Sequence, residues 1–293
     1  MPDLPMSDLL DRRLHAYRPD LAEEALRGRV EALAFVEGNP GMITVPVVQL
    51  RSTPDLFAGT DTELLLGETL RILDVAQGWA WIKADRDGYV GYVPDYAVVS
   101  DGPAPTHIVT VPRSFVYSGP DLRLPTVQAL SMGCRLTLVG EHSTRGTLYR
   151  TLPDGSAVVA AHVAPLEAPP APDYVAVAAR FLETPYLWGG RSGFGIDCSG
   201  LVQLCLMMAG QAAPRDTDMQ EAGLGQAIAR EALRRGDLVF WKGHVAIMED
   251  DTTILHANGH SMTVAREPLI DAIERVERLY GGPTSYRRPR ASE

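Results

Sequence analysis

The chain has 293 residues, of which 45% are hydrophobic and 22% are charged. This is the composition of a soluble globular protein rather than of a disordered or membrane-embedded one. At roughly 100–150 residues per domain, the length predicts two or three domains. The formal net charge of −10 argues against binding to nucleic acid or to an anionic membrane surface through bulk electrostatics.

The first residues of the chain mix acidic and basic side chains and lack the apolar core of a secretory signal. No stretch of the sequence approaches the roughly 18 apolar residues of a membrane span. The three cysteines, Cys134, Cys198 and Cys205, are not spaced as a disulfide framework, which is consistent with a reducing compartment. We therefore expect a cytoplasmic protein.

The N-terminal half of the sequence divides into a short extension and two related units. Residues 7–36 carry apolar side chains at helical spacing and predict a helical extension within 1–40. Short β-like runs bounded by Gly, Pro and Asp turns predict a small barrel over 41–103. The pattern recurs over 104–167, where Thr110-Val111-Pro112 repeats Thr44-Val45-Pro46 and Gly133 repeats Gly67 at an offset of 66 positions. Two copies of one small β fold are therefore predicted.

A segment rich in proline and alanine, 165–173, predicts a linker before a third domain at 168–293. In that domain we expect helices near 175–182, 198–208 and 220–234, then strands around 237–241, 244–249, 253–257 and 262–265. Helices followed by a run of antiparallel strands indicate an α+β fold.

Cys198 is the candidate nucleophile of this domain. Four glycines between 189 and 195 predict an irregular loop, and Asp197-Cys198-Ser199 then begins an apolar helix. The positive end of a helix dipole and its unpaired N–H groups favour a thiolate over a thiol. The alternative is a buried, inert thiol. Cys205 lies roughly 10 Å further along the helix, too far for a disulfide, and we expect it in the core, as we do Cys134.

Two histidines follow in the predicted strands. His244 begins the run HVAIMED, and His256 stands in the next run, ILHANGH. Adjacent antiparallel strands could join them, with His244 as the base and His256 as its orienting partner. Asn258 and His260 compete for the orienting role. We expect neither a metal site, because a fourth zinc ligand is not evident, nor a nucleotide site, because no phosphate-binding loop of the Walker type occurs.

Several of these motifs closely resemble the NlpC/P60 family. They are PYLWGGRS at 185–192, GIDCSGLVQ at 195–203, RGDLVF at 235–240, GHVAI at 243–247 and His256. The run GWAWIKADRDGYVGYV at 78–93 resembles bacterial SH3 (SH3b) domains, and the second copy follows only from the repeat. The resemblance implies two SH3-like barrels before a papain-like α+β catalytic domain, a triad of Cys198, His244 and His256, and no cofactor.

The resemblance also implies a substrate and further site residues. The expected reaction is hydrolysis of the bond between D-γ-glutamate and a diamino acid in peptidoglycan stem peptides, with a free N-terminal L-alanine, during recycling of soluble fragments. The implied substrate contacts are Asp197, which would also pair with the substrate ammonium, Ser199, Tyr186, Trp188, Thr217, Tyr89 and Glu63. The alternatives are a non-catalytic protein that binds the cell wall and a thiol acyltransferase of the same superfamily. The identity of the diamino acid, meso-diaminopimelate or lysine, stays open.

Overall fold

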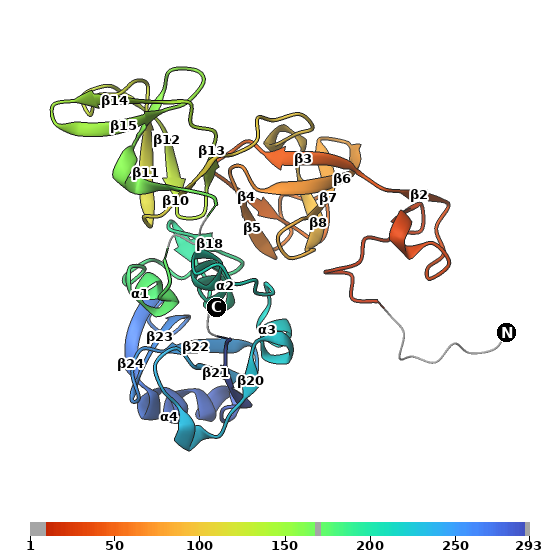
Figure 1. Cartoon of the computed structure of the whole chain (residues 1–293). Coiled ribbons are helices and arrows are strands. Elements are labelled where there is room, and N and C mark those ends of the chain that lie inside the picture. The colour runs from red at the N-terminus through yellow and green to blue at the C-terminus, as the bar shows by residue number, and fades with distance from the viewer. Residues whose placement is uncertain (1–9, 168–170, 291–293) are drawn as a thin grey trace.

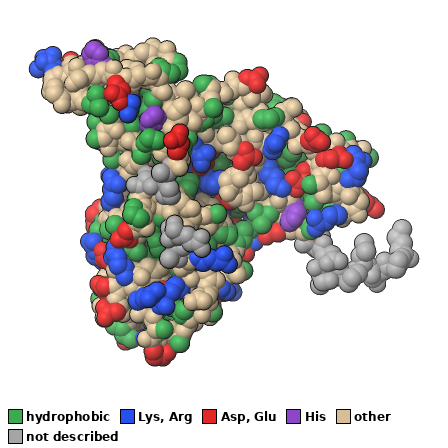
Figure 2. All heavy atoms as spheres, viewed as in Figure 1, with side chains coloured by type: hydrophobic (Ala, Val, Ile, Leu, Met, Phe, Trp, Pro, Cys, Tyr) green, Lys and Arg blue, Asp and Glu red, His purple; other side chains and the backbone are tan. Residues whose placement is uncertain are grey.

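The computed structural model describes residues 10–167 and 171–290, which form an N-terminal segment and three further units (Figure 1). In this view the first β unit lies between the N-terminal segment and the second β unit, and the C-terminal unit lies below them. Among the described residues, no helix is long and apolar enough to cross a membrane. Charged side chains of both signs are interspersed over the visible face (Figure 2).

The N-terminal segment differs from the predicted helix. Its described part, from residue 10 onward, holds two parallel strands, β1 (Leu21–Glu23) and β2 (Ala34–Val36), around the 3₁₀ turn η1 (Glu24–Leu26), and it has no α-helix. The helical prediction is therefore wrong for these residues, while 1–9 lie outside the described part. Pro19 and Gly28, whose φ is +79°, interrupt helical geometry, and Leu33, on the expected apolar face, is 90% exposed.

The first β unit is an antiparallel sheet wrapped around an apolar core. Its five-stranded sheet has the order β8-β7-β6-β3-β9, and a hairpin of β4 and β5 covers one side. The elements are β3 (Asn39–Ile43), β4 (Val47–Leu50), β5 (Thr62–Leu65), β6 (Thr69–Ala76), β7 (Trp79–Ala84), β8 (Val90–Pro94), η2 (Asp95–Ala97) and β9 (Val98–Val99). Alternate side chains such as Leu70 and Ile72 on β6 point into the core, as the two-residue period of a strand requires.

The second β unit has a similar succession of elements, but two shorter strands, β13 and β14, stand where the first unit has the single strand β6. Its sheets have the orders β12-β11-β16-β15-β14 and β13-β10-β17. The elements are β10 (His107–Val109), β11 (Arg113–Tyr117), β12 (Thr126–Ser131), β13 (Arg135–Leu136), β14 (Gly140–Thr144), β15 (Thr147–Thr151), β16 (Ala157–Val159), η3 (Ala160–His162) and β17 (Val163–Pro165). Gly67 and Gly133 both adopt positive φ, +76° and +91°, and a 3₁₀ turn precedes the last strand of each unit.

The C-terminal unit is a six-stranded sheet, β20-β25-β21-β22-β23-β24, between two helical layers. The helices are α1 (Tyr174–Ala179), α2 (Cys198–Met208), α3 (Thr217–Gly223), η4 (Arg230–Ala232) and α4 (Leu269–Tyr280). The strands are β18 (Arg191–Ser192), β19 (Gly195–Ile196), β20 (Gln226–Ala227), β21 (Leu238–Trp241), β22 (His244–Met248), β23 (Thr253–Asn258), β24 (Thr263–Pro268) and β25 (Ser285–Arg288). Leu238 and Phe240 face the α1 and α2 core, while Val239 and Trp241 face α4.

Most predicted elements of this unit are confirmed. The helix over 198–208 and the four strands occur where the pattern predicted them. The predicted helix over 220–234 is wrong beyond Gly223, because Gly225 adopts a φ of +57° and only the short η4 follows. The glycine-rich loop is more regular than predicted, since it contains the hairpin of β18 and β19.

Two glycines of this hairpin region allow close packing between units. A Cβ on Gly189, whose φ is +74°, would lie 2.6 Å from the carbonyl oxygen of Thr60 in the first β unit. A Cβ on Gly193 would lie 1.9 Å from the carbonyl oxygen of Pro112 in the second. Only glycine fits at either position, so the loop that precedes Cys198 is held against both β units.

A buried ionic network fixes the same loop to the first β unit. Both oxygens of Glu68 accept hydrogen bonds from Arg86 at 2.7 Å, and Arg191 on β18 also donates to Glu68. Arg86 pairs in addition with Asp87, which accepts a 2.8 Å bond from Gln203 on α2. Burial alone would raise the pKa of Glu68, but the charges of Arg191 and Arg86 outweigh it and hold that pKa at about 2.

Candidate active site

Cys198 is the first residue of α2, as predicted. Asp197 caps the helix, because its Oδ1 accepts the backbone N–H of Gly200 at 2.7 Å. Burial, followed by the charge of Asp197, raises the pKa of Cys198 to about 11, against the opposing effects of the Val245 N–H and the Thr217 hydroxyl. Burial is the largest of these effects, and it favours the neutral thiol over the thiolate.

His244 and His256 lie together on neighbouring strands. β22 pairs antiparallel with β23, and His244 Nε2 is 3.0 Å from His256 Nδ1. The hydrogen bond from the Val245 N–H to Cys198 brings the start of β22 beside the thiol. Asn258 instead accepts the backbone N–H of His260 at 3.0 Å and so shapes the turn after β23. Of the three candidates for the orienting role, His256 is the one that contacts His244.

A carboxylate and a guanidinium continue this chain of contacts. Glu267 Oε2, on β24, lies 3.1 Å from His256 Nε2, and Arg275 on α4 donates to both Glu267 oxygens at 3.0 and 2.6 Å. Burial, His256 and Arg275 lower the pKa of His244 to about 3, although Glu267 acts in the opposite direction. His244 is thus a neutral imidazole at neutral pH. Neither Glu267 nor Arg275 was predicted, because they belong to no recognisable motif.

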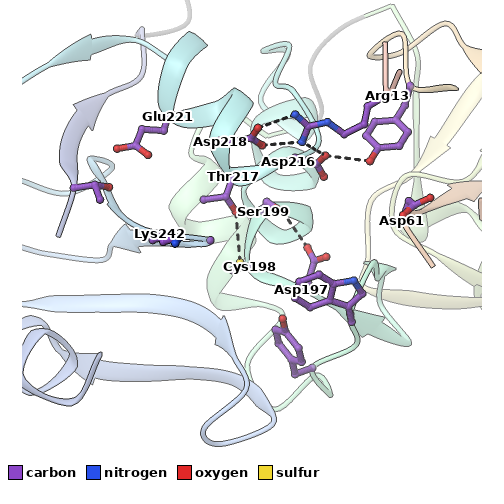
Figure 3. A pocket seen from close by; sticks show the side chains of 15 residues that line it. Arg13, Asp61, Asp197, Cys198, Ser199, Asp216, Thr217, Asp218, Glu221 and Lys242 are labelled. Atoms are coloured by element: carbon purple, nitrogen blue, oxygen red, sulfur yellow. Dashed lines mark hydrogen bonds and ion pairs between the residues drawn. The ribbon is translucent and has the colours of Figure 1, made fainter. Parts of the chain in front are cut away.

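A cavity of about 630 Å³ opens over the thiol, between the C-terminal unit and the first β unit (Figure 3). Its lining includes most of the predicted contacts: Tyr89, Tyr186, Trp188, Asp197, Cys198, Ser199 and Thr217. Thr217 Oγ1 lies 3.9 Å from the Cys198 sulfur, and the Tyr89 hydroxyl donates to Asp216 at 3.0 Å. No group of three or more His, Cys, Asp or Glu side chains in the described ranges is arranged to hold a metal ion.

Two predicted contacts are placed differently. Glu63 is 4% exposed, accepts the backbone N–H of Arg191 at 2.8 Å and does not line the cavity, so it holds the two units together instead. Asp197 lines the cavity, but Arg215, which is buried, donates to both of its oxygens at 3.0 and 2.7 Å. Because its charge is already paired, Asp197 is unsuited to the expected role of binding a substrate ammonium.

Other carboxylates occupy the end of the cavity at the first β unit. Asp61 lines it, and burial, followed by the charge of Asp216, raises the pKa of Asp61. Arg13, from the N-terminal segment, donates to Asp216 at 2.8 Å and to Asp218 at 2.7 Å. Asp216 and Asp218 flank the predicted Thr217 in sequence, but nothing local marked Asp61 or Arg13. We call this part of the cavity, lined by Asp61 and Asp216, its acidic end. Arg13 of the N-terminal segment closes it.

Comparisons with known proteins agree with this architecture. The NlpC/P60 family model matches residues 183–276, and the model described as bacterial dipeptidyl-peptidase Sh3 domain matches residues 50–98. A gamma-D-glutamyl-L-lysine dipeptidyl-peptidase of Bacillus cereus is 27% identical, over 71% of this chain and 70% of its own length. Dipeptidyl-peptidase 6 of Lysinibacillus sphaericus is 24% identical, over 74% and 87%.

A solved structure supports the fold. An NlpC/P60 family protein from Bacillus cereus superposes with a TM-score of 0.71 at 23% identity, and the match covers 85% of this chain and 99% of that one. The fold of most of this chain is therefore a known arrangement. From the two family matches, the position of Cys198 at the start of α2 and the contact between His244 and His256, it follows that this chain carries an NlpC/P60 cysteine-peptidase domain preceded by a bacterial dipeptidyl-peptidase SH3 domain.

Proposed function

We propose that the protein hydrolyses the bond between γ-D-glutamate and the diamino acid in peptidoglycan stem peptides that carry a free N-terminal L-alanine. The observation that carries the proposal is the cavity that joins Cys198 to the acidic end at Asp61 and Asp216. A peptide amine bound at that end directs the rest of the peptide toward the thiol. The names of the relatives, which are dipeptidyl peptidases, support the same reaction.

We place one proton on each imidazole from the groups that lie beside its two nitrogens. If Glu267 accepts the Nε2–H of His256, then His256 Nδ1 carries a lone pair and accepts the Nε2–H of His244. His244 Nδ1 then carries no proton, and its lone pair can take the proton of Cys198. Glu267 is thus a positioning residue, because it acts on the base through His256, and Arg275 holds Glu267 in place.

The reaction begins from a neutral thiol and a neutral imidazole, because the pKa of Cys198 is about 11 and that of His244 about 3. The proton moves from sulfur to His244 as the sulfur attacks the γ-glutamyl carbonyl, and a backbone N–H at the start of α2 binds the oxyanion. Collapse breaks the C–N bond, and His244 returns the proton to the leaving amine. Water, deprotonated by His244, then hydrolyses the thioester and releases L-Ala-D-Glu and the free thiol.

The closed acidic end explains the length of the product. Asp61, which forms no ion pair with a described cation, would bind the ammonium of L-alanine, while Arg13, held by Asp216, blocks further extension of the peptide. In the intact cell wall the L-alanine nitrogen is part of an amide, so a free amine occurs only in released peptides. We therefore propose soluble fragments, and a recycling role, rather than the intact wall. The cytoplasmic location stays a prediction, which cell fractionation can test.

We also propose that the second β unit is a divergent SH3-like barrel. It repeats the glycine at positive φ and the 3₁₀ turn of the first unit, although its sequence lacks the paired tryptophans of that unit. Its contacts support the site indirectly, because Ser131 accepts the backbone N–H of Gly193 at 2.9 Å.

Mass spectrometry of peptide digests tests the proposed reaction. We expect the protein to release L-Ala-D-Glu from L-Ala-γ-D-Glu-L-Lys and to leave the N-acetylated peptide intact. Asp61→Asn should lower kcat/KM for the free peptide roughly 10- to 100-fold, the equivalent of one charged hydrogen bond. Asp95→Asn, an exposed carboxylate of the same β unit outside the cavity, is the matched control and should match wild type. Equal cleavage of free and acetylated peptides would contradict the ammonium site.

The pH dependence of kcat/KM tests the histidine pair. Because the pKa of His244 is lowered to about 3, the base stays neutral and active as pH falls through 6.5, the value of an ordinary histidine. In the plot of kcat/KM against pH, the fall on the acid side (the acid limb) should therefore lie well below pH 6.5. Glu267→Gln removes a charge that raises this pKa, so it should move the acid limb further down and lower kcat at least about tenfold. An acid limb near 6.5, or a wild-type kcat in Glu267→Gln, would contradict the assignment.

A further inference from the structure

The cavity continues past Cys198, away from the acidic end. Its lining there includes Lys242, Glu221 and Thr284. Figure 3 shows Lys242 and Glu221 on one side of Cys198 and Asp61 and Arg13 on the other. If the N-terminal amine binds at Asp61, as the proposed function requires, the residue that leaves after cleavage lies beside Lys242 and Glu221.

Lys242 offers an unpaired cation in a fixed place. It stands in the two-residue turn Lys242-Gly243 that joins β21 to β22, and the strand pair Trp241 and His244 closes the turn. Gly243, the second central residue, adopts a φ of +74°, as a type II turn requires there. The side chain is exposed and forms no ion pair with any described residue. The other lysine of the sequence, Lys83, is by contrast bound to Glu23 at 2.7 Å.

Glu221 offers an unpaired carboxylate on the same side. It stands on α3, where one oxygen accepts the hydroxyl of Ser285 at 2.7 Å, and no described cation pairs with it. That contact anchors the side chain and leaves the second oxygen for a ligand. Asp216 and Asp218, at the start of α3, are instead paired with Arg13. At the start of α3 the carboxylates are thus neutralised by Arg13, whereas the carboxylate of Glu221 remains available to a ligand.

We infer that Lys242 and Glu221 form the binding site for the leaving diamino acid, an inference that rests on the proposed function. Lys242 binds its α-carboxylate, and Glu221 binds its side-chain ammonium. L-Lysine at this position carries both groups, and each would gain a charge-assisted hydrogen bond in a partly closed cavity. The site thereby selects a peptide that ends at the diamino acid, because a further residue would turn the α-carboxylate into a neutral amide.

Three peptides separate the two contacts: L-Ala-γ-D-Glu followed by L-lysine, by L-lysinamide, or by L-norleucine. Lys242→Met should lower kcat/KM about tenfold or more for the lysine peptide and leave that for the lysinamide peptide unchanged. Glu221→Gln should lower kcat/KM by a similar factor for the lysine peptide and leave that for the norleucine peptide unchanged. Glu274→Gln, an exposed glutamate on α4 outside the cavity, should behave as wild type with all three.

The outcomes distinguish this site from the proposed function. Wild-type protein that cleaves all three peptides with equal kcat/KM overturns the diamino acid site and leaves the dipeptidyl-peptidase function standing. The diamino acid site is also overturned if either variant lowers kcat/KM equally for all three peptides. Wild-type protein that cleaves none of them, while iodoacetamide still alkylates Cys198, overturns the proposed function and this site with it.

Discussion

Cys198→Ala is expected to lower kcat on L-Ala-γ-D-Glu-L-Lys by on the order of 10⁴-fold or more. The substitution removes the sulfur that attacks the γ-glutamyl carbonyl, and no neighbouring group can replace it: Ser199 donates to Asp197 and accepts a hydrogen bond from Arg215. Initial rates of dipeptide release, followed by mass spectrometry, measure the loss. A variant that keeps more than a tenth of the wild-type rate would contradict nucleophilic catalysis by this residue.

The control for this loss is Cys205→Ala. Cys205 lies on the same helix and is fully buried in the core, and it does not line the cavity. We expect its substitution to lower stability slightly and to leave kcat within about threefold of wild type, since truncating a small core side chain leaves the site in place. Iodoacetamide should label one cysteine in the folded wild type, and none in Cys198→Ala, because all three thiols are buried and, of the three, Cys198 alone lines the cavity.

Glu68→Gln is expected to lower the free energy of unfolding by about 3–5 kcal/mol at pH 7, the usual effect of removing one partner from a buried ionic network. The variant keeps the shape of the side chain but leaves Arg191, which is fully buried, without a carboxylate. The lowered pKa of Glu68 determines how this stabilisation changes with pH. The stabilisation is complete above about 4.5, the unfolded value, and is lost as pH falls toward about 2.

Urea unfolding followed by tryptophan fluorescence measures this difference. Glu24→Gln is the matched control, because Glu24 forms an exposed ion pair with Arg27 three residues away. We expect no measurable change for the control, as is usual for surface ion pairs. Equal unfolding midpoints for Glu68→Gln and wild type would show that the network contributes nothing to the attachment of the catalytic unit.

The nucleophile and the two histidines could be predicted because local sequence determines their placement. The Asp197 cap fixes where α2 begins, and two largely apolar, paired strands bring His244 and His256 together. The N-terminal helix was wrong for an equally local reason, since Pro19 and Gly28 outweigh the apolar spacing around them. Sequence periodicity therefore predicts an element only where no residue of restricted backbone geometry interrupts it.

The remainder of the site depends on contacts between segments far apart in the chain. Arg13 and Asp216 are 203 residues apart, yet their side chains form one end of the cavity. Burial is also a property of the whole fold, and it is the largest effect on the pKa of Cys198. A motif can thus name a nucleophile, but its protonation state and its pocket follow from how the units pack together.

The proposed substrate and its direction of binding would be seen together in a crystal structure of Cys198→Ala with bound L-Ala-γ-D-Glu-L-Lys. We predict the L-alanine ammonium beside Asp61 and Asp216, the γ-glutamyl carbonyl carbon at the position of the missing sulfur, and the lysine beside Lys242 and Glu221. A peptide bound in the opposite direction, or with its amine outside the acidic end closed by Arg13, would contradict both the proposed substrate and the dipeptide product.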